Sequence, residues 1–210
     1  TEAYDANSGM MALDARWALP KLQVLRPSPK GEYYVTDLVE AAVAEGGDPW
    51  PVVTVSESPD LLWGINDRAE LAAAETLLLE RIQREHLRSG VTIRRPETVT
   101  IEAGVLIGQD TTIEPGTVVR RGTSIGTGCV IGPNSIIEAS TIGNNVTITS
   151  SVVERSAIGE DSDVGPFAHL RPGSDIAAGV HIGNFVEIKQ SRLDTGVRAG
   201  HMSYLGDARI

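Results

Sequence analysis

The sequence predicts a mixed fold: the C-terminal part of an α/β domain, then a linker helix, then a left-handed parallel β-helix of hexapeptide repeats. Three observations lead to this prediction. Aliphatic residues recur at every sixth position from about Ile101 onward, helix and strand patterns alternate over residues 1–65, and a long helical pattern lies between these regions. Ordinary strands repeat about every 2 residues and helices about every 3.6, so a sustained period of six indicates a solenoid.

Residues 1–65 carry the first part of this pattern. The expected elements, in chain order, are a strand over 9–13, a helix from the capping residue Asp14 to about Val24, a helix over 38–44 capped by Thr36 or Asp37, and a strand over 51–56. Asp and Thr side chains can accept hydrogen bonds from the free amides of a helix N-terminus. Strands that alternate with helices are typical of an α/β domain.

The linker helix is expected over residues 66–90. Asp67 and Glu70 have the spacing of a capping box, and Gly90 provides a stop signal. Because this helix leaves one core and meets the solenoid, the chain is predicted to divide into residues 1–65, 66–90 and 91–210.

The hexapeptide array defines the last region. Each hexad is expected to form a short strand and a corner, and three hexads a triangular coil of about 18 residues, so residues 99–210 predict about six coils. The residues expected to point inward are Ile101, Ile107, Ile113, Val119, Ile125, Ile131, Ile137, Ile142, Ile148, Val153, Ile158, Val164, Leu170, Ile176, Ile182, Ile188, Leu193, Ala199 and Leu205. One coil alone buries no core, so stability requires stacked neighbours and a cap or partner at each open end.

The composition argues against several classes of function. A net charge of −10 disfavours binding to nucleic acid or to an anionic membrane, because such binding needs clustered Lys and Arg. The longest apolar runs fall far short of the roughly 20 residues that a membrane span needs. Cys129 is the single cysteine, which indicates a reducing compartment such as the cytoplasm, and its small-residue position indicates a packing role. The chain starts without Met and stops inside a hexad, so we interpret it as an interior piece of a longer protein.

Six motifs, in a fixed order, are specific enough to suggest a family. They are DANSG at 5–9, GEYYVTD at 31–37, WGINDRAEL at 63–71, GPFAHLRPG at 165–173, GNFVEIK at 183–189 and GHMSYLGDA at 200–208. With the hexapeptide array, this order closely resembles the bifunctional N-acetylglucosamine-1-phosphate uridyltransferase and glucosamine-1-phosphate N-acetyltransferase, over essentially the whole chain. The array alone is weak evidence, because many acyltransferases and some non-enzymes contain one; the last three motifs are specific.

The resemblance implies a cytoplasmic bacterial transferase that makes a precursor of peptidoglycan and the cell wall. Such an enzyme transfers an acetyl group from acetyl-CoA to glucosamine 1-phosphate. It then couples the product to UTP with Mg²⁺, giving UDP-N-acetylglucosamine and pyrophosphate. The resemblance also implies an α/β nucleotidyltransferase domain before the solenoid, and a homotrimer whose acetyl-transfer site lies between neighbouring subunits.

Four residues correspond to the family's acetyl-transfer site. His201 matches the general base, which is needed because the substrate amine is an ammonium ion at neutral pH and must lose a proton before it attacks a thioester. Arg171 and Lys189 match residues that hold the sugar phosphate, and Tyr204 matches a substrate contact. The spacing adds independent support: 189 − 171 = 18 is one coil, so both cations should lie on the same outer face and share an anion rather than repel each other.

The resemblance implies a second site, of which half is present. Asn7, Tyr34 and Thr36 match contacts with the sugar nucleotide, and Asn66 matches a ligand of Mg²⁺ and the nucleotide. The glycine-rich phosphate loop, the lysine and the aspartate that would complete this site are missing from the sequence, as are the later coils of the acetyl-CoA pocket. We therefore expect these 210 residues alone to be incomplete for both activities.

Two other functions stay open. His169, His181 and His201 could form the imidazole cluster of a metal-dependent hydratase. However, 181 − 169 = 12 is two hexads, which should put the first two on different faces of the triangle. The other alternative is a non-catalytic sugar-nucleotide-binding or assembly module built on the same folds.

Overall fold

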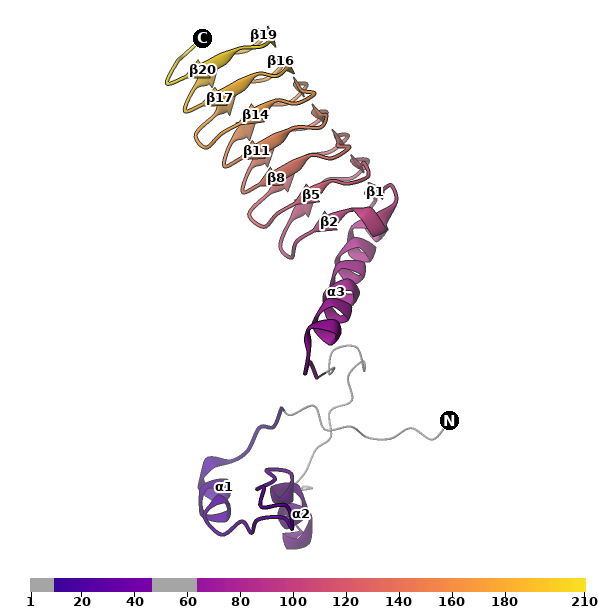
Figure 1. Cartoon of the computed structure of the whole chain (residues 1–210), viewed down its shortest axis with the longest axis vertical. Helices are drawn as coiled ribbons and strands as arrows, with labels where there is room; N and C mark the ends of the chain where they lie inside the picture. The colour runs from indigo at the N-terminus through magenta and orange to yellow at the C-terminus, as the bar shows by residue number, and fades with distance from the viewer. Residues whose placement is uncertain (1–9, 47–63) are drawn as a thin grey trace. The chain divides into compact units, whose positions relative to one another are not determined.

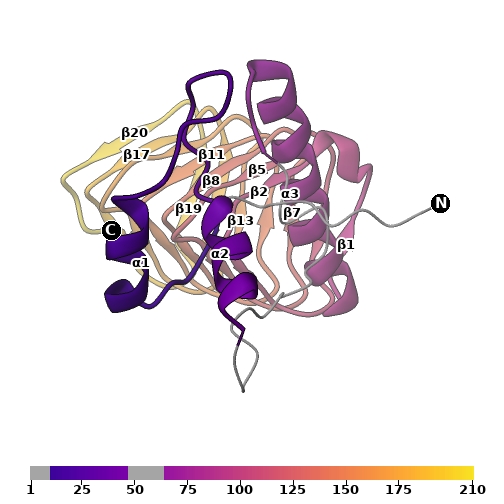
Figure 2. The ribbon, with the colours of Figure 1, turned by 90° about the horizontal axis from the view of Figure 1, so that it is seen from below.

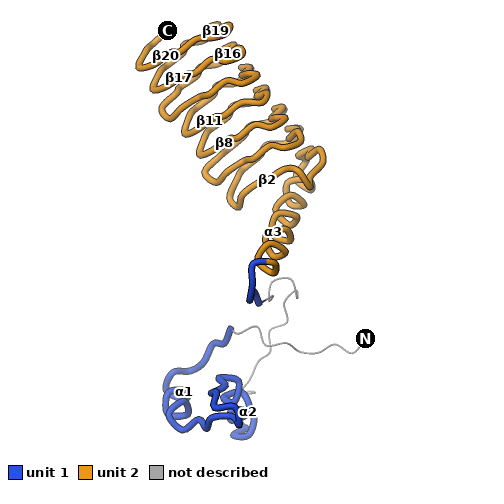
Figure 3. The backbone as a smooth tube through the Cα atoms, in the orientation of Figure 1, with its two compact units in different colours: residues 1–68 blue, residues 69–210 orange. Residues whose placement is uncertain are grey.

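The computed structural model describes residues 10–46 and 64–210, and the chain divides into two compact units, residues 1–68 and 69–210 (Figure 3). The described part of the first unit contains two helices. The described second unit contains one α-helix followed by a solenoid. No helix within these described ranges is both long enough and apolar enough to cross a membrane.

Two helices, α1 (Ala15–Leu22) and α2 (Asp37–Glu45), confirm the helices predicted for the first unit. Asp14 caps α1 as predicted, because its Oδ1 accepts a hydrogen bond from the Arg16 amide at 2.8 Å. Thr36 is the N-cap residue of α2, but its side chain makes no capping hydrogen bond.

The strand predicted over 9–13 is wrong for the residues that the structure describes, since residues 10–13 are irregular. The apolar side chains of this segment, Met10 among them, are exposed, and no described strand pairs with it. An extended segment becomes a strand only when its backbone groups find hydrogen-bond partners. The strand predicted over 51–56 lies outside the described residues.

The helix predicted over 66–90 is α3 (Arg68–Arg88). Gln83 of this helix is buried, and its Nε2 donates to the carbonyl oxygens of Pro96 at 3.0 Å and Val99 at 2.7 Å. Pro96 is the first residue of a 3₁₀ helix, Pro96–Thr98, and Val99 is its C-cap residue. One buried amide side chain therefore ties α3 to the start of the solenoid.

The rest of the chain forms a parallel β-solenoid whose short strands stack in three sheets (Figure 1, Figure 2). Sheet A has the order β1-β4-β7-β10-β13-β16-β19, sheet B the order β2-β5-β8-β11-β14-β17-β20, and sheet C the order β18-β15-β12-β9-β6-β3. The strands are β1 (Thr92–Ile93), β2 (Thr100–Ile101), β3 (Leu106–Ile107), β4 (Thr112–Ile113), β5 (Val118–Val119), β6 (Ser124–Ile125), β7 (Val130–Ile131), β8 (Ile136–Glu138), β9 (Thr141–Ile142), β10 (Thr147–Ile148), β11 (Val152–Glu154), β12 (Ala157–Ile158), β13 (Asp163–Val164), β14 (His169–Leu170), β15 (Asp175–Ile176), β16 (His181–Asn184), β17 (Glu187–Lys189), β18 (Arg192–Leu193), β19 (Arg198–His201) and β20 (Tyr204–Gly206).

Sheets A and B each contain seven strands, so the solenoid has about seven coils, one more than predicted. One reason is that β1 already pairs with β4 at Thr92, before the expected start at residue 99. The other is that some coils are shorter than 18 residues: the register partners Ile137 and Val153 are 153 − 137 = 16 residues apart, and Val153 and Leu170 are 170 − 153 = 17 apart. Shorter coils fit more turns into the same length of chain.

The inward-pointing aliphatic residues form the core of the solenoid, as predicted. Leu170 and Ile188, for example, are fully buried and are direct register partners. Burial of such a side chain stabilises the fold by about 1.5–3 kcal/mol. The packing role predicted for Cys129 is also confirmed, because the residue is fully buried and its Sγ lies 3.1 Å from the carbonyl oxygen of Gly143 in the next coil.

Candidate functional site

The outer face of sheet B carries two columns of side chains, one residue before and one residue after each inward-pointing residue. The first outer column runs through Val118, Ile136, Val152, His169, Glu187 and Tyr204, and the second outer column through Arg120, Glu138, Glu154, Arg171, Lys189 and Gly206. Because successive residues of a strand point to opposite faces, all these positions face outward.

Arg171 and Lys189 are neighbours in the second outer column. They directly follow Leu170 and Ile188, which are register partners in adjacent coils. Adjacent strands of a sheet lie about 4.8 Å apart. The prediction that the two basic residues lie on one outer face at a one-coil spacing is therefore confirmed, and their binding role stays a prediction.

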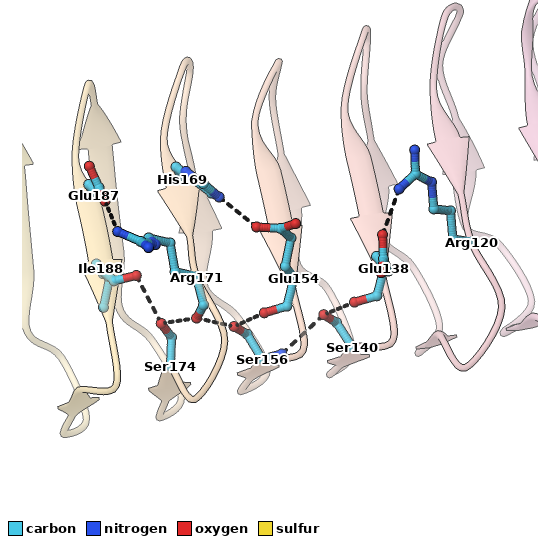
Figure 4. Close-up of polar contacts among 10 residues, drawn as sticks. All are labelled: Arg120, Glu138, Ser140, Glu154, Ser156, His169, Arg171, Ser174, Glu187 and Ile188. Carbon is cyan, nitrogen blue, oxygen red and sulfur yellow. Dashed lines mark hydrogen bonds and ion pairs between the residues drawn. The ribbon is translucent and has the colours of Figure 1, made fainter.

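Each of these basic side chains already has a carboxylate partner. Arg171 Nη1 donates to Glu187 Oε1 at 2.9 Å (Figure 4), and Lys189 Nζ lies 3.9 Å from Asp207 Oδ2. The sequence reasoning missed both acids, although 187 − 171 = 16 and 207 − 189 = 18 are spacings of neighbouring coils. The argument that two stacked cations require a bound anion is wrong in that form, because the protein itself supplies compensating charge.

The two ion pairs are open to solvent. The side chains of Arg171 and Glu187 are 44% and 41% exposed, and those of Lys189 and Asp207 are 37% and 67% exposed. Ion pairs in such positions contribute about 0–1 kcal/mol. An incoming anion can therefore replace the carboxylates at little cost.

Polar contacts continue through the preceding coils of sheet B (Figure 4). Arg120 Nη1 donates to Glu138 at 2.6 Å, and Glu154 lies 2.8 Å from the Nε2 atom of His169. Arg120 thus has the same column position and the same kind of partner as Arg171, three coils away. It provides a natural internal control for any binding role of Arg171.

Tyr204 reaches the second outer column although its backbone belongs to the first. Its register partner is Glu187, whereas Gly206 is the partner of Lys189. A β-carbon built on Gly206 would lie 2.5 Å from the Tyr204 hydroxyl oxygen and 2.7 Å from the Cε1 and Cζ ring atoms. The phenol ring therefore lies over Gly206, and its hydroxyl follows Arg171 and Lys189 in the same column.

His201 ends β19, in the same coil as Tyr204, and its register partner is Asn184 of the preceding coil. Its side chain is exposed, and the ring forms no hydrogen bond or ion pair with any residue in the described part of the chain. Two residues, Met202 and Ser203, separate it from Tyr204 at the corner between sheets A and B. The last coil thus presents an imidazole whose nitrogens are available to a ligand.

The other two imidazoles of the solenoid have carboxylate partners and lie on different sheets, as the spacing predicted. His169 is on β14 of sheet B beside Glu154, and His181 is on β16 of sheet A, 2.6 Å from Asp163. Among the described residues, no group of three or more His, Cys, Asp or Glu side chains is placed to hold a metal ion. The geometry does not support the hydratase alternative.

A stack of large apolar residues lies at the corner beside His201, and the sequence reasoning missed it. The rings of Phe167 and Phe185 stack with their centroids 5.3 Å apart at 19°, and both residues are more than half exposed. Both have a left-handed backbone, with φ of 60° and 56°, as has Met202 in the next coil. Their spacing of about one coil was visible in the sequence. Large side chains rarely adopt this conformation, so the stack marks an unusual surface.

The residues expected to contact the sugar nucleotide belong to the first unit. Tyr34 is exposed and donates its hydroxyl hydrogen to Glu32 at 2.7 Å, Thr36 precedes α2, and Asn66 precedes α3. Asn7 lies outside the described residues. Asn66 offers a single amide oxygen, whereas Mg²⁺ usually needs one or two carboxylates, and the described residues hold no suitable acidic cluster. The described residues therefore do not make up a Mg²⁺ site by themselves.

A protein-family model and several curated proteins match this chain. A family model described as "GMPPB C-terminal domain" matches residues 100–195. The bifunctional protein GlmU of Staphylococcus haemolyticus (strain JCSC1435) is 44% identical over 209 residues, which is 98% of this chain and 46% of that protein. The bifunctional protein GlmU of Geobacillus thermodenitrificans (strain NG80-2) is 44% identical over 212 residues, 100% of this chain and 45% of that protein. The chain thus spans slightly less than half the length of these curated relatives, which confirm the resemblance that the motifs predict.

Solved structures give weaker similarities. The acetyltransferase domain of PglB from Neisseria gonorrhoeae FA1090 is 18% identical, with a TM-score of 0.43, over 59% of this chain and 60% of that one. The UDP-N-acetylglucosamine acyltransferase from Campylobacter jejuni is 21% identical, with a TM-score of 0.35, over 54% of this chain and 57% of that one. These scores are too low to support any inference about ligands or residues.

Proposed function

We propose that this chain, which is homologous over nearly its whole length to one part of the bifunctional GlmU proteins, carries the glucosamine 1-phosphate half of an acetyltransferase site. In the complete protein, acetyl transfer from acetyl-CoA to glucosamine 1-phosphate precedes uridyl transfer from UTP to give UDP-N-acetylglucosamine. The observation that carries the proposal is the alignment of Arg171, Lys189 and the Tyr204 hydroxyl in one outer column, with His201 in the same coil as Tyr204.

The basic residues bind the phosphate group of the substrate. Arg171 and Lys189 exchange their carboxylate partners, Glu187 and Asp207, for phosphate oxygens. The existing pairs are solvent-exposed and weak, whereas a phosphate bridging two cations forms several charge-assisted hydrogen bonds at once. The Tyr204 hydroxyl donates a further hydrogen bond from the end of the column.

His201 acts as the general base. Its exposed imidazole nitrogen accepts a proton from the substrate ammonium group, which leaves a neutral amine with a free electron pair. That pair forms the new C–N bond at the thioester carbonyl of acetyl-CoA, and the C–S bond breaks to release the CoA thiolate. The nitrogen then carries two protons: one is lost to solvent or to the thiolate, and the other stays on the amide product.

Other parts of the proposal rest on the family resemblance. The protein is cytoplasmic and works as a homotrimer, which would cover part of the outer surface of the solenoid, including exposed apolar residues such as Phe167 and Phe185. Asn7, Tyr34 and Thr36 contact the sugar nucleotide. Asn66 contributes to Mg²⁺ binding together with groups outside the described residues.

The proposal is tested by calorimetric titration of this chain with glucosamine 1-phosphate. We expect Arg171→Ala to weaken binding by about tenfold or more, because it removes charge-assisted hydrogen bonds. The matched control is Arg120→Ala, which removes the same kind of residue from the same column and should leave the affinity unchanged within about twofold. Equal affinities for the two variants, or no saturable binding by the unmodified chain, would contradict the proposal.

The non-catalytic alternative is tested in the chain extended to the full length of its relatives. Saturable binding of glucosamine 1-phosphate without transfer of label from [¹⁴C]acetyl-CoA would favour a binding module over an acetyltransferase.

A further inference from the structure

Gly206 ends a column of long side chains. The five preceding residues of the second outer column all carry charged side chains: Arg120, Glu138, Glu154, Arg171 and Lys189. The next register position, beside Lys189, has no side chain at all. The space above it is filled by the ring of Tyr204.

The backbone does not explain the glycine. Gly206 is not among the residues with a positive φ, so an L-amino acid can adopt its backbone conformation. The conflict for a larger residue is with a side chain instead, because a β-carbon would approach the Tyr204 hydroxyl to 2.5 Å and two ring carbons to 2.7 Å. The missing β-carbon therefore makes room for the ring.

Tyr204 and Gly206 face the same side of the strand, because they are two residues apart. With no side chain at 206, the tyrosine can fold along the strand and bring its hydroxyl from the first outer column into the second. There the hydroxyl follows Lys189 by one coil, as Lys189 follows Arg171.

We propose that Gly206 is a positioning residue, which holds the Tyr204 hydroxyl in the phosphate-binding column formed with Arg171 and Lys189. This inference rests on the proposed function, and it adds a residue that contacts no substrate. Tyr204 is 59% exposed, so its ring can turn into solvent when a β-carbon is introduced. Gly206→Ala should therefore move the hydroxyl and leave the fold intact.

The test compares four variants: Gly206→Ala, Tyr204→Phe, the double variant, and Gly200→Ala. The last is the matched control, since a β-carbon on Gly200 meets no atom within 4 Å and its φ is not left-handed. Two quantities are measured for each. Nuclear Overhauser effects between the Tyr204 ring protons and the α-protons of residue 206 report the ring position, and calorimetry reports the affinity for glucosamine 1-phosphate.

In the unmodified chain we expect strong Overhauser effects between the ring and Gly206, and in Gly206→Ala their loss. Tyr204→Phe and Gly206→Ala should each weaken binding by about tenfold, as expected for a lost hydrogen bond to a charged group. The double variant should bind no more weakly than Tyr204→Phe alone, because both changes remove the same interaction. Gly200→Ala should bind like the unmodified chain.

Unchanged Overhauser effects in Gly206→Ala would overturn the proposal whatever the affinities are. So would an additive loss of affinity in the double variant, since Gly206 would then act through something other than the Tyr204 hydroxyl. Failure of the proposed function has a different signature: Arg171→Ala would bind like the unmodified chain even where the Overhauser effects report the expected ring position.

Discussion

Sheet B carries two different outer surfaces on one uninterrupted stack of strands. In the early coils, defined by β5, β8 and β11, the first outer column consists of β-branched residues; in the late coils, defined by β14, β17 and β20, it consists of His169, Glu187 and Tyr204. The inward-pointing residues are aliphatic and buried in almost every coil.

The corner between sheets A and B changes at the same place along the chain. Residues with a left-handed backbone at this corner include Asn134 and Ser150 in the early coils, and Phe167, Phe185 and Met202 in the late coils. Asn adopts this conformation easily and large side chains do not. Both halves form the same solenoid, so the fold does not require large residues in a left-handed conformation. Their presence at the corner of the late coils therefore points to a function there.

The largest expected effect is on the rate of acetyl transfer, and it comes from a residue of the late coils. In the chain extended to the full length of its relatives, His201→Ala should lower kcat of acetyl transfer by about 10²- to 10⁴-fold, as is typical for a positioned general base. The affinity for glucosamine 1-phosphate should change little, because Arg171 and Lys189 hold the phosphate. Uridyl transfer, measured in the same preparation, serves as the folding control. Near-normal acetyl transfer would remove His201 from the mechanism.

Core substitutions should show no difference between the halves. Ile131→Ala in the early coils and Ile182→Ala in the late coils each remove a fully buried side chain. Each should lower the free energy of unfolding by about 2–5 kcal/mol, through lost burial and the cavity left behind. Urea denaturation of both variants measures this. A much smaller cost for Ile182→Ala would mean that the late coils are packed differently, and the contrast would not be confined to the outer surface.

Removing a surface ion pair should have little effect on stability in either half, and should affect binding only in the late coils. Arg120→Ala and Arg171→Ala each remove one exposed pair, and each should change the free energy of unfolding by less than about 1 kcal/mol. Only the second should weaken the binding of glucosamine 1-phosphate. A large loss of stability in Arg171→Ala would indicate that its pair with Glu187 is structural. The late coils would then differ from the early coils in what their surface ion pairs contribute to stability.

The smallest effect concerns Cys129, a buried corner residue of the early coils. Burial raises the pKa of the Cys129 thiol above its ordinary value. The folded state therefore favours the protonated thiol, so this contribution to stability is fully present below the thiol's unfolded pKa of about 8.5 and is lost as pH rises through the folded pKa. Relative to Cys129→Ser, the unmodified chain should lose stability as pH rises above about 8.5, the unfolded pKa of a thiol. A difference that stays constant as pH rises would show that folding does not raise the pKa of the Cys129 thiol.

The inner structure was largely predictable from the sequence, and the outer contacts were not. Inward positions repeat with a regular period because each packs on an equivalent residue in the next coil, so Leu170 and Ile188 could be paired by counting. The cap at Asp14 was predictable because it is local. The number of coils was underestimated because coils of 16 and 17 residues accumulate along the chain.

Outer contacts depend on where long side chains turn, which a spacing does not specify. Arg171 turns to Glu187 in the first outer column rather than straight along its own column. Tyr204 lies over Gly206 because a side chain is missing there, and a missing side chain leaves no periodic signal. The acids that pair with Arg171 and Lys189 lie at the spacings of neighbouring coils. However, nothing in the sequence distinguished them from other surface acids.

The most direct test of the difference between early and late coils is to follow the backbone amide resonances of this chain during titration with glucosamine 1-phosphate. The account predicts saturable shifts confined to residues 165–208 and largest near Arg171, Lys189 and Tyr204, with no change around Arg120 and Glu138. Shifts spread evenly over sheet B, or centred on the early coils, would contradict it.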